Sequence, residues 1–203
     1  MEKKVLVVGG GVNGLSTGIC LLEDGWNVTI YSAEFSPNTT SDVAAALWYP
    51  FLSAPIEKTD VWGSRTYDIL KLLTADKNTG IQMTQTYEYF RSPQPDPTWM
   101  STVDNFERIT QSLPSDYVEC FSFTTQIIEM PIYLKWLMDR FQKLGGFIEK
   151  SEVDDFSKLP SEFNIIVNCT GLNSVKLFSD PDVYPVLGQI IRVKPIIDEM
   201  HLD

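Results

Sequence analysis

The chain has 203 residues, of which 43% are hydrophobic, and its 16 basic and 27 acidic residues give a net charge of −11. A chain of this length and hydrophobic content can bury a substantial core, so we expect a soluble globular protein. The negative charge repels phosphate backbones and anionic lipids, which argues against nucleic acid and membrane surfaces as partners.

The cysteines and the single histidine do not form a metal-binding pattern. Cys20, Cys120 and Cys169 are far apart and include no CxxC pair, and His201 is two residues from the end of the chain. We expect no metal site and read the cysteines as inert thiols in a reducing compartment, with a single disulfide left open as an alternative.

The first element predicted is a buried strand at residues 5–8, Val-Leu-Val-Val, because a continuous apolar run is typical of a strand covered on both faces of a parallel sheet. Glycines follow at 9, 11 and 14, which is the GxGxxG spacing. The first glycine suits a tight turn, the second lets backbone approach a pyrophosphate, and the third lets the next helix pack closely. This pattern predicts nucleotide binding without distinguishing NAD from FAD.

A helix should follow the glycines and end at Gly25, and residues 26–31 alternate as a second strand, which completes a β-α-β unit. An acidic residue after this second strand usually binds the ribose hydroxyls. Here the strand is followed by Ser32 and Ala33, and only then by Glu34. Glu34 is therefore either a displaced ribose ligand or a solvated loop carboxylate.

Residues 35–50, FSPNTTSDVAAALWYP, offer three consecutive hydroxyls followed by small residues and an apolar wall. Thr39, Thr40 and Ser41 could contact phosphates, and the alanines at 44–46 leave room for a flat ring such as isoalloxazine. By composition alone, the same stretch also reads as a capped helix start with Ser41 or Asp42 as the N-cap.

The rest of the chain suggests a second domain inserted in the first. We expect a helix over residues 62–73 with Trp62, Tyr67, Leu70 and Leu73 on one face, and strands of a mostly antiparallel sheet over 81–91 and 117–132. A helix over 131–144 then returns the chain to the nucleotide domain. The remaining predicted elements are a strand over 147–153 and a buried strand over 164–169.

Five stretches together resemble the D-amino-acid oxidase and D-aspartate oxidase family of FAD flavoenzymes. They are VVGGGVNGLSTGICLL, FSPNTTSDVAAALWYP, PDPTWM, YLKWLMDRF and IIVNCTG, and they occur in order along essentially the whole chain. The resemblance implies an α/β fold, with a Rossmann-like FAD-binding domain and a second, mostly antiparallel β-rich substrate domain that is incomplete here. The expected boundaries are 1–52 and 146–176 for the FAD-binding domain, 53–145 for the substrate domain, and 177–203 for a truncated return to the substrate domain.

The resemblance also implies a set of FAD-binding residues, in which the glycine loop binds the pyrophosphate and the residues late in the chain contact the adenosine side. The predicted set is Gly9, Gly10, Gly11, Val12, Asn13, Gly14, Glu34, Thr39, Thr40, Ser41, Ala46, Leu47, Val153, Thr170 and Gly171. Three positions depart from the family pattern. Ala33 stands where the family has its acidic residue, Ala46 where a glycine is common, and Tyr49 where a glutamine is frequent.

The reaction implied by the resemblance is oxidation of a D-amino acid by O2 and water to a 2-oxo acid, ammonia and hydrogen peroxide, with the cofactor carrying the redox chemistry. A bidentate arginine is the natural clamp for the substrate carboxylate. None of the five arginines matches the family's clamp, and we name no catalytic residue; they are Arg65, Arg91, Arg108, Arg140 and Arg192.

The chain therefore resembles the N-terminal portion of such an oxidase, and two alternatives stay open. One is a non-catalytic nucleotide-binding module, and the other is a related FAD amine oxidase of the glycine or sarcosine type. Open sheet edges favour association, either as a homodimer or with the C-terminal segment of the family. The run at residues 5–22 is interrupted by glycines and reads as mature protein, so we expect a cytoplasmic or peroxisomal location.

Overall fold

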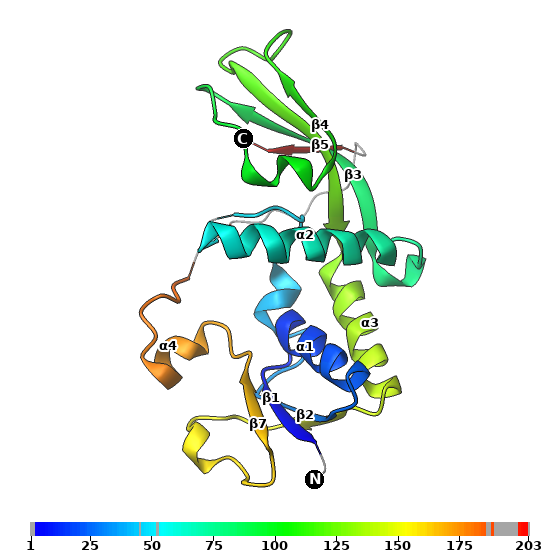
Figure 1. The fold of residues 1–203 in the computed structure, drawn as a ribbon, viewed down its shortest axis with the longest axis vertical. Coiled ribbons are helices and arrows are strands. Elements are labelled where there is room, and N and C mark those ends of the chain that lie inside the picture. The colour runs from blue at the N-terminus through cyan, green and yellow to red at the C-terminus, as the bar shows by residue number, and fades with distance from the viewer. Residues whose placement is uncertain (1–2, 45, 52, 186–187, 189–198, 203) are drawn as a thin grey trace. The chain divides into compact units, whose positions relative to one another are not determined.

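The computed structural model describes residues 3–44, 46–51, 53–185, 188 and 199–202, and it divides into two compact units. Unit 1 comprises residues 1–45 and 130–190, and unit 2 comprises residues 46–129 and 191–203 (Figure 1). This division differs from the boundaries expected from the sequence, since the helix over 130–143 belongs to unit 1. Of the expected return segment at 177–203, residues 186–187, 189–198 and 203 lie outside the described residues.

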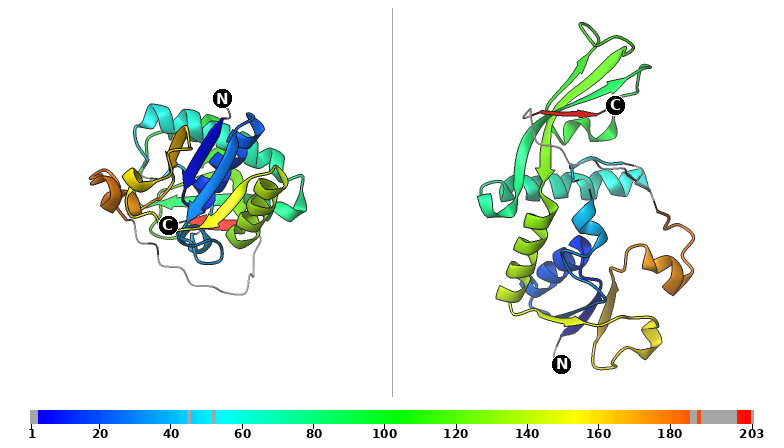
Figure 2. Two further views of the ribbon diagram at one scale, coloured as in Figure 1. Left: turned by 90° about the horizontal axis from the view of Figure 1, so that it is seen from below. Right: turned by 180° about the vertical axis from the view of Figure 1, so that it is seen from behind.

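Unit 1 is built around a parallel sheet of four strands in the order β6-β2-β1-β7. Its strands and helices are β1 (Lys4–Val8), α1 (Val12–Glu23), β2 (Asn27–Ser32), the 3₁₀ helix η1 (Thr40–Val43), α3 (Met130–Lys143), β6 (Phe147–Lys150), the 3₁₀ helix η4 (Phe156–Lys158), β7 (Ile165–Asn168) and α4 (Asn173–Phe178). The strands lie side by side in two further views (Figure 2). The predicted β-α-β unit and the Rossmann-like parallel sheet are confirmed.

Helices α1 and α3 pack against each other beside the sheet. A Cβ on Gly18 of α1 would lie 2.7 Å from the ring of Phe141 in α3, so the absence of a side chain allows this close approach. Tyr133, Leu137 and Phe141 of α3 are buried as their spacing predicted, whereas Leu144 is 43% exposed because the helix has ended before it. Burial of such side chains contributes about 1.5–3 kcal/mol each.

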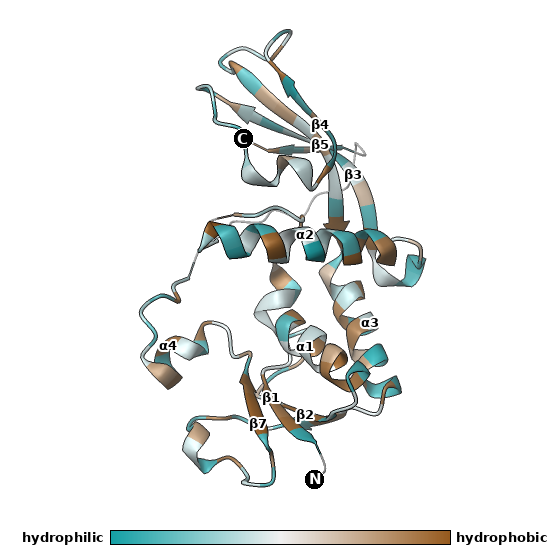
Figure 3. Ribbon diagram, in the orientation of Figure 1, coloured by the Kyte–Doolittle hydropathy of each residue, from teal (hydrophilic) through white to brown (hydrophobic). Residues whose placement is uncertain are grey.

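The inner strand β1 and the edge strand β7 are both apolar (Figure 3), but they differ in how far they are buried. All four residues from Val5 to Val8 in β1 are buried. In β7, which has been predicted as a buried strand, Ile165 is 43% exposed and Ile166 is 38% exposed. That prediction is wrong for the described residues, because β7 lies at the sheet edge and pairs only with β1.

Unit 2 contains a second four-stranded sheet, in the order β4-β5-β3-β8. Its elements are α2 (Ile56–Leu73), the 3₁₀ helix η2 (Lys77–Thr79), β3 (Ile81–Phe90), the 3₁₀ helix η3 (Thr98–Ser101), β4 (Asp104–Ile109), β5 (Glu119–Ile128) and β8 (Glu199–Leu202). The β3–β5 and β4–β5 pairs are antiparallel and β8 runs parallel to β3, which confirms a mostly antiparallel sheet.

Helix α2 begins six residues before its predicted start, directly after Pro55. Tyr67 and Leu70 are buried as expected, and the Tyr67 hydroxyl donates to the Thr124 carbonyl at 3.0 Å. Trp62, which was predicted for the same face, is 62% exposed, so this part of the prediction is wrong. Its indole does not share the buried stripe, since Tyr67 and Leu70 point to another side of the helix.

Candidate functional site

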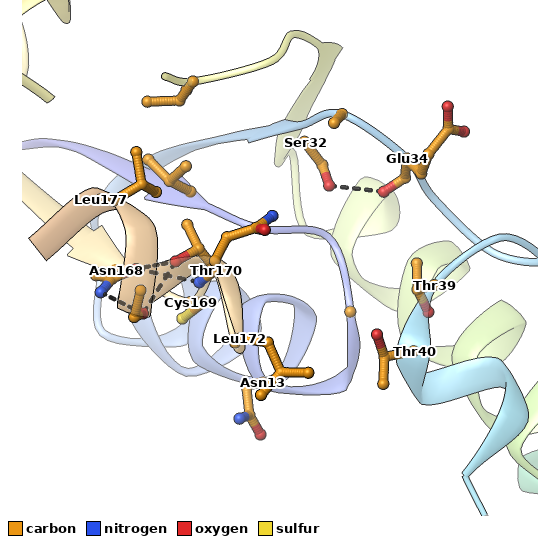
Figure 4. Close-up of a pocket in the computed structure, with 18 of the residues that line it drawn as sticks. Asn13, Ser32, Glu34, Thr39, Thr40, Asn168, Cys169, Thr170, Leu172 and Leu177 are labelled. Carbon is orange, nitrogen blue, oxygen red and sulfur yellow. Dashed lines mark hydrogen bonds between the residues drawn. The ribbon is translucent and has the colours of Figure 1, made fainter. Parts of the chain in front are cut away.

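A cavity of about 780 Å³ opens in unit 1 at the carboxyl ends of the parallel strands. Its walls come from the ends of β1, β2 and β7, the loop after β6, η1 and the start of α4 (Figure 4). In open parallel sheets, ligands bind at these strand ends, and a volume of this size is in the range of small-molecule and cofactor sites. The cavity is therefore the candidate binding site.

The turn between β1 and α1 depends on Gly9 and Gly14, at which a side chain would clash with backbone atoms. Gly9 has a φ of +117°, and a Cβ there would lie 2.2 Å from the Cys169 carbonyl oxygen. A Cβ on Gly14 would lie 1.8 Å from the Gly9 carbonyl oxygen. The glycine roles read from the sequence are thus explained: Gly9 turns the chain and Gly14 lets α1 approach the turn.

Gly11 lines the cavity with its backbone. A Cβ at this position would lie 3.0 Å from the Ser41 hydroxyl oxygen, which is a tight contact. That oxygen accepts a hydrogen bond from the Val12 amide at 3.1 Å, so η1 supplies an acceptor to the first residue of α1. The start of a helix carries partial positive charge and favours anions. This arrangement fits a phosphate group of a dinucleotide.

The three hydroxyls of residues 39–41 have different roles. Thr39 is the N-cap of η1, and its hydroxyl and amide both donate to the Asp42 carboxylate, at 2.6 Å and 2.9 Å. The Thr39 hydroxyl proton is thus used within the chain, although Thr39, Thr40 and Ser41 all line the cavity. The alternative of a capped helix start is correct in kind, but the cap is Thr39 rather than Ser41 or Asp42.

Asp42 is a buried carboxylate that holds this segment together. It accepts hydrogen bonds from Thr39 and from the Ser36 hydroxyl, the latter at 2.5 Å. Burial raises the pKa of the Asp42 carboxyl, but the hydrogen bonds from Ser36 and Thr39 outweigh it and leave the pKa below its ordinary value. The carboxylate is therefore ionised under ordinary conditions and fixes the geometry of η1.

The end of β2 brings Glu34 to the cavity, and Lys150 at the end of β6 holds its carboxylate. The Lys150 ammonium lies 2.9 Å and 3.0 Å from the two Glu34 oxygens. Ser32, which the sequence reasoning missed, accepts from the Gly10 amide at 2.9 Å and donates to the Glu34 carbonyl at 2.6 Å. Its position as the last residue of the strand was the signal that could have found it.

The end of β7 carries a compact group of polar side chains, of which the sequence analysis predicted only Thr170. Asn168 Oδ1 accepts from the Thr170 amide at 3.1 Å and from its hydroxyl at 2.7 Å, and Asn168 Nδ2 donates to the Ser174 hydroxyl at 3.0 Å. The Thr170 and Ser174 hydroxyls are 3.0 Å apart. The Asn-x-Thr spacing, typical of an Asx turn, was the signal for Asn168.

Most of the predicted FAD-binding residues lie together in this cavity. Those that line it are Gly9, Gly11, Val12, Asn13, Glu34, Thr39, Thr40, Ser41, Val153, Thr170 and Gly171. Gly10 and Gly14 do not line it and shape the turn instead: a Cβ on Gly10 would lie 2.4 Å from the Phe35 ring. The binding role of the whole set stays a prediction.

Three residues expected near the flavin belong to unit 2. The Ala46 carbonyl accepts from the Ile128 amide at 2.8 Å, and Leu47 forms a bridge with Ile127. The Tyr49 hydroxyl donates to Glu88 Oε1 at 2.7 Å. Burial raises the pKa of both groups of this pair. Their role toward a flavin ring stays a prediction.

The arginines of the described residues are mostly engaged elsewhere. Arg108 forms ion pairs with Glu119 and with Asp96, the latter at 2.6 Å, and Arg140 pairs with Glu23 at 2.5 Å. Arg192 lies outside the described residues.

Among the residues that the structure describes, no group of three or more His, Cys, Asp or Glu side chains could hold a metal ion.

No helix in the described part of the chain is long and apolar enough to cross a membrane. The cavity residues fit a bound FAD on the chemistry of the groups they present, with the positively polarised start of α1 and the hydroxyls of Thr40 and Ser41 for phosphates, and side-chain oxygens at the ends of β2 and β7 for neutral groups.

The sequence is similar to curated oxidases along nearly its whole length. It is 37% identical to the D-amino-acid oxidase of Rubrobacter xylanophilus over 98% of this chain and 62% of that protein, and 37% identical to that of Dictyostelium discoideum over 98% and 59%. It is 34% identical to the human D-aspartate oxidase over 94% and 60%. The chain thus spans about three-fifths of the length of these relatives.

The fold is similar to that of solved amino-acid oxidases and deaminases. Glycine oxidase from Bacillus cereus matches with a TM-score of 0.60 and 17% identity over 88% of this chain and 58% of that chain. The L-amino acid deaminase from Proteus vulgaris matches with a TM-score of 0.66 and 15% identity over 88% and 56%. The family model described as DAO, FAD dependent oxidoreductase, matches residues 4–203. The chain therefore belongs to the DAO family of FAD dependent oxidoreductases, as its motifs predicted.

Proposed function

We propose that this chain carries the FAD-binding part of an oxidase of D-amino acids. The reaction would convert a D-amino acid, O2 and water to a 2-oxo acid, ammonia and hydrogen peroxide, and FAD, when bound, would accept the substrate hydride. The observation that supports this most is the cavity behind the glycine turn, within a sequence 37% identical to two D-amino-acid oxidases over 98% of its length.

The chain's own residues would bind and orient the cofactor. The positively polarised start of α1, together with the hydroxyls of Thr40 and Ser41, would hold the pyrophosphate, since a helix start favours an anion. Glu34 would accept from the ribose hydroxyls, with Lys150 holding its carboxylate in place. Val153, Thr170 and Gly171 would contact the adenosine side, and Ala46 and Leu47 would lie near the ring.

The first test is the visible absorption spectrum of the purified chain before and after addition of FAD and removal of the excess. A retained flavin band would support the proposed site. A colourless protein would contradict the proposal that this chain binds FAD by itself.

The second test is turnover, measured as hydrogen peroxide release from D-alanine and from D-aspartate, with the L-enantiomers as controls. The relatives include oxidases named for D-amino acids and for D-aspartate, so both substrates belong in the assay. Peroxide from a D-enantiomer alone supports the proposed reaction, and the preferred substrate would assign the neutral or acidic class.

A non-catalytic nucleotide-binding module is the second candidate. The observation that favours it is that the chain spans about three-fifths of its relatives, while Arg108 and Arg140 are engaged in ion pairs and none of the described arginines lines the cavity. A coloured protein that gains turnover when the C-terminal segment of a relative is added would support the first candidate, whereas nucleotide binding without turnover in either case would support the second. The glycine or sarcosine alternative has only the fold in its favour.

The association and location predictions accompany this proposal. A homodimer, or pairing with a C-terminal segment, would cover the exposed Ile165 and Ile166 at the edge of the parallel sheet, and light scattering of the purified chain tests the first of these. A cytoplasmic or peroxisomal location would be tested by fractionation of the source cells.

A further inference from the structure

Unit 2 contains a second cavity, of about 500 Å³, beside helix α2. Its walls come from the segment at 47–54, from α2 and from the end of β5, all of which belong to unit 2 (Figure 1). Among the described residues that line this cavity, none carries a formal charge. A ligand would therefore be recognised there by aromatic rings, neutral polar groups and apolar contact.

Three aromatic residues line the unit 2 cavity: Trp48, Tyr49 and Trp62. Trp48 is buried, and its indole nitrogen donates to the Gly63 carbonyl at 3.0 Å, which holds the ring against α2. Trp62 is 62% exposed, so solutes can reach its ring. The face of an aromatic ring carries partial negative charge and attracts cations, and tryptophan does so most strongly. The aromatic wall therefore favours a positively charged ligand.

Two threonines of α2 line the same cavity, and both donate their hydroxyl protons to the helix backbone. Thr59 donates to the Pro55 carbonyl at 3.1 Å, and Thr66 donates to the Trp62 carbonyl at 2.8 Å. A carbonyl oxygen cannot donate, so the direction of both bonds is fixed. A hydroxyl has one proton and two lone pairs. What Thr59 and Thr66 offer a ligand is therefore acceptance of a hydrogen bond.

The other two hydroxyls of the cavity wall are used in the same way. Ser53 donates to the Phe51 carbonyl at 3.2 Å, and Tyr49 donates to Glu88 Oε1 at 2.7 Å. Their oxygens keep lone pairs, but their protons are bonded within the chain. The hydroxyls of this cavity thus present acceptors to a ligand.

Aromatic rings together with spare lone pairs match an organic cation. An alkylammonium group has three N–H donors and a positive charge, so it can bond a hydroxyl oxygen and lie against a ring. A carboxylate or phosphate would place its lone pairs against those of the wall. The amides of the first turn of α2, which favour anions, belong to residues 56–58, and these do not line the cavity. The net charge of −11 also attracts cations to the chain.

We propose that the unit 2 cavity binds an alkylammonium ion, with the Trp62 ring against the cation and the Thr66 hydroxyl as an acceptor. Two sources supply this chemistry, namely a free amine and the side chain of a basic amino acid. Trp62 and Thr66 are not among the proposed FAD contacts, so this inference does not depend on the proposed function.

The experiment is a titration of the purified, isotopically labelled chain with butylammonium chloride, followed by NMR through the indole N–H signals of its five tryptophans. Butanol is the neutral ligand of similar shape, and butyrate is the anionic one. We expect butylammonium to bind more tightly than either. Equal affinity for butylammonium and butanol would overturn the proposal, because the cavity would then select apolar shape rather than charge.

The Trp62→Leu variant tests the aromatic ring. Leucine keeps an apolar side chain there but has no ring, so butylammonium should bind about fivefold more weakly while butanol binding stays the same. Phe51→Leu is the matched control, since Phe51 is also 62% exposed but does not line the cavity. Thermal unfolding checks that both variants are folded. An equal loss of butylammonium affinity in the two variants would contradict the role of Trp62.

The Thr66→Val variant tests the acceptor. Butylammonium should bind about fivefold more weakly to this variant, and Thr66→Ser should restore the affinity. The control is Thr74→Val, because the Thr74 hydroxyl also donates to a helix carbonyl, that of Lys71 at 2.7 Å, but does not line the cavity. A Thr66→Val variant with wild-type affinity would remove this hydroxyl from the site.

Titration with D-lysine, L-lysine and D-norleucine distinguishes the two sources of the cation. D-lysine binding more tightly than both L-lysine and butylammonium would identify an amino-acid side chain, and equal affinity for the three amines would identify a free amine. D-norleucine, which lacks the side-chain charge, should bind more weakly than D-lysine in both cases. A chain that binds butylammonium but not FAD would contradict only the proposed function, and one that binds FAD but not butylammonium would contradict only this inference.

Discussion

Two neighbouring strands of the parallel sheet, β1 and β7, end side by side and lead into helices, yet their turns are built from different chemistry. The pair is in register at Val8 and Asn168, so both turns face the same cavity. The β1 turn consists of glycines and presents backbone amides from a 12-residue helix, whereas the β7 turn consists of hydrogen-bonded side chains before a six-residue helix. The comparison shows that neighbouring strand ends of one sheet can present backbone groups in one turn and side-chain groups in the other.

The two turns also depend on each other, because the backbone of one fills the space next to the other. The largest effect on stability is expected from Gly14→Ala. Its Cβ would lie 1.8 Å from the Gly9 carbonyl oxygen, and Gly9 in turn packs against the Cys169 backbone of the β7 turn. We expect a loss of about 3 kcal/mol in the free energy of unfolding, measured by urea denaturation, together with loss of FAD binding. The control is Gly63→Ala in α2, where the nearest atom is an ordinary 3.5 Å away. A Gly14 variant as stable as the wild type would show that the turn can relax.

The donor character of the β1 turn is tested next, by Ser41→Ala. This change removes the acceptor of the Val12 amide and one hydroxyl of the cavity wall. We expect FAD affinity to fall about tenfold and stability to fall by about 1 kcal/mol. The control is Thr59→Ala, which removes a hydroxyl bonded to the Pro55 carbonyl in unit 2. Equal FAD affinity in the two variants would remove Ser41 from the site.

An effect of intermediate size is expected in the pH dependence of stability, through the Asp42 carboxylate that binds Ser36 and Thr39. The Asp42 pKa is lower in the folded chain than its ordinary value of about 3.9, so its contribution to stability is present above that value and is lost as pH falls through the folded pKa. We expect the free energy of unfolding of the wild type to fall below about pH 4 as this contribution is lost. The Asp42→Asn variant should not show this part of the fall. Identical acid slopes in urea melts of the two proteins would contradict the assignment.

The smallest effect is expected at the end of β2, from Glu34→Gln. The pair with Lys150 is half exposed, and such pairs contribute only about 0–1 kcal/mol, so stability should barely change. FAD affinity should fall a few-fold while FMN affinity stays the same, because FMN lacks the adenosine ribose. Glu162→Gln, which removes the partner of Lys4 outside the cavity, is the control. An equal loss for FMN would place Glu34 away from the adenosine ribose.

The sequence predicted the β1–α1–β2 unit well, because there local pattern and final environment agree. Residues 5–8 are apolar and β1 has a paired strand on both sides, so the prediction of burial is correct. Residues 165–167 are equally apolar, but within the described part of the chain β7 pairs with β1 alone, and no local sequence window reports how many neighbours a strand has. Strands β4 and β8 were missed for a related reason, since their pairing with β5 and β3 is long-range.

Within the candidate site, the glycine turn was easier to predict from the sequence than the polar side chains at the ends of β2 and β7. Glycine spacing is visible in any single sequence because it follows from a steric requirement. The hydrogen bond from the Asn168 side chain needs Ser174, which comes from the next helix. The Ser32 hydroxyl accepts from the Gly10 amide, which lies 22 positions earlier. In the sequence alone, nothing distinguishes these polar residues from others, because their hydrogen-bond partners are known only from the fold.

The discontinuous path of unit 1 has a consequence for how the protein is made. Unit 1 needs residues 1–45 and 130–190, and the Lys4 amide finds its Asn164 partner 160 positions further along. During synthesis, β1 and the glycine turn emerge first and must wait while all of residues 46–129 are translated before β7 can pair with them. Long-range pairing of this kind is slow and leaves apolar strands unpaired in the interval. We therefore expect the nascent chain to depend on chaperones until β7 of unit 1 has left the ribosome.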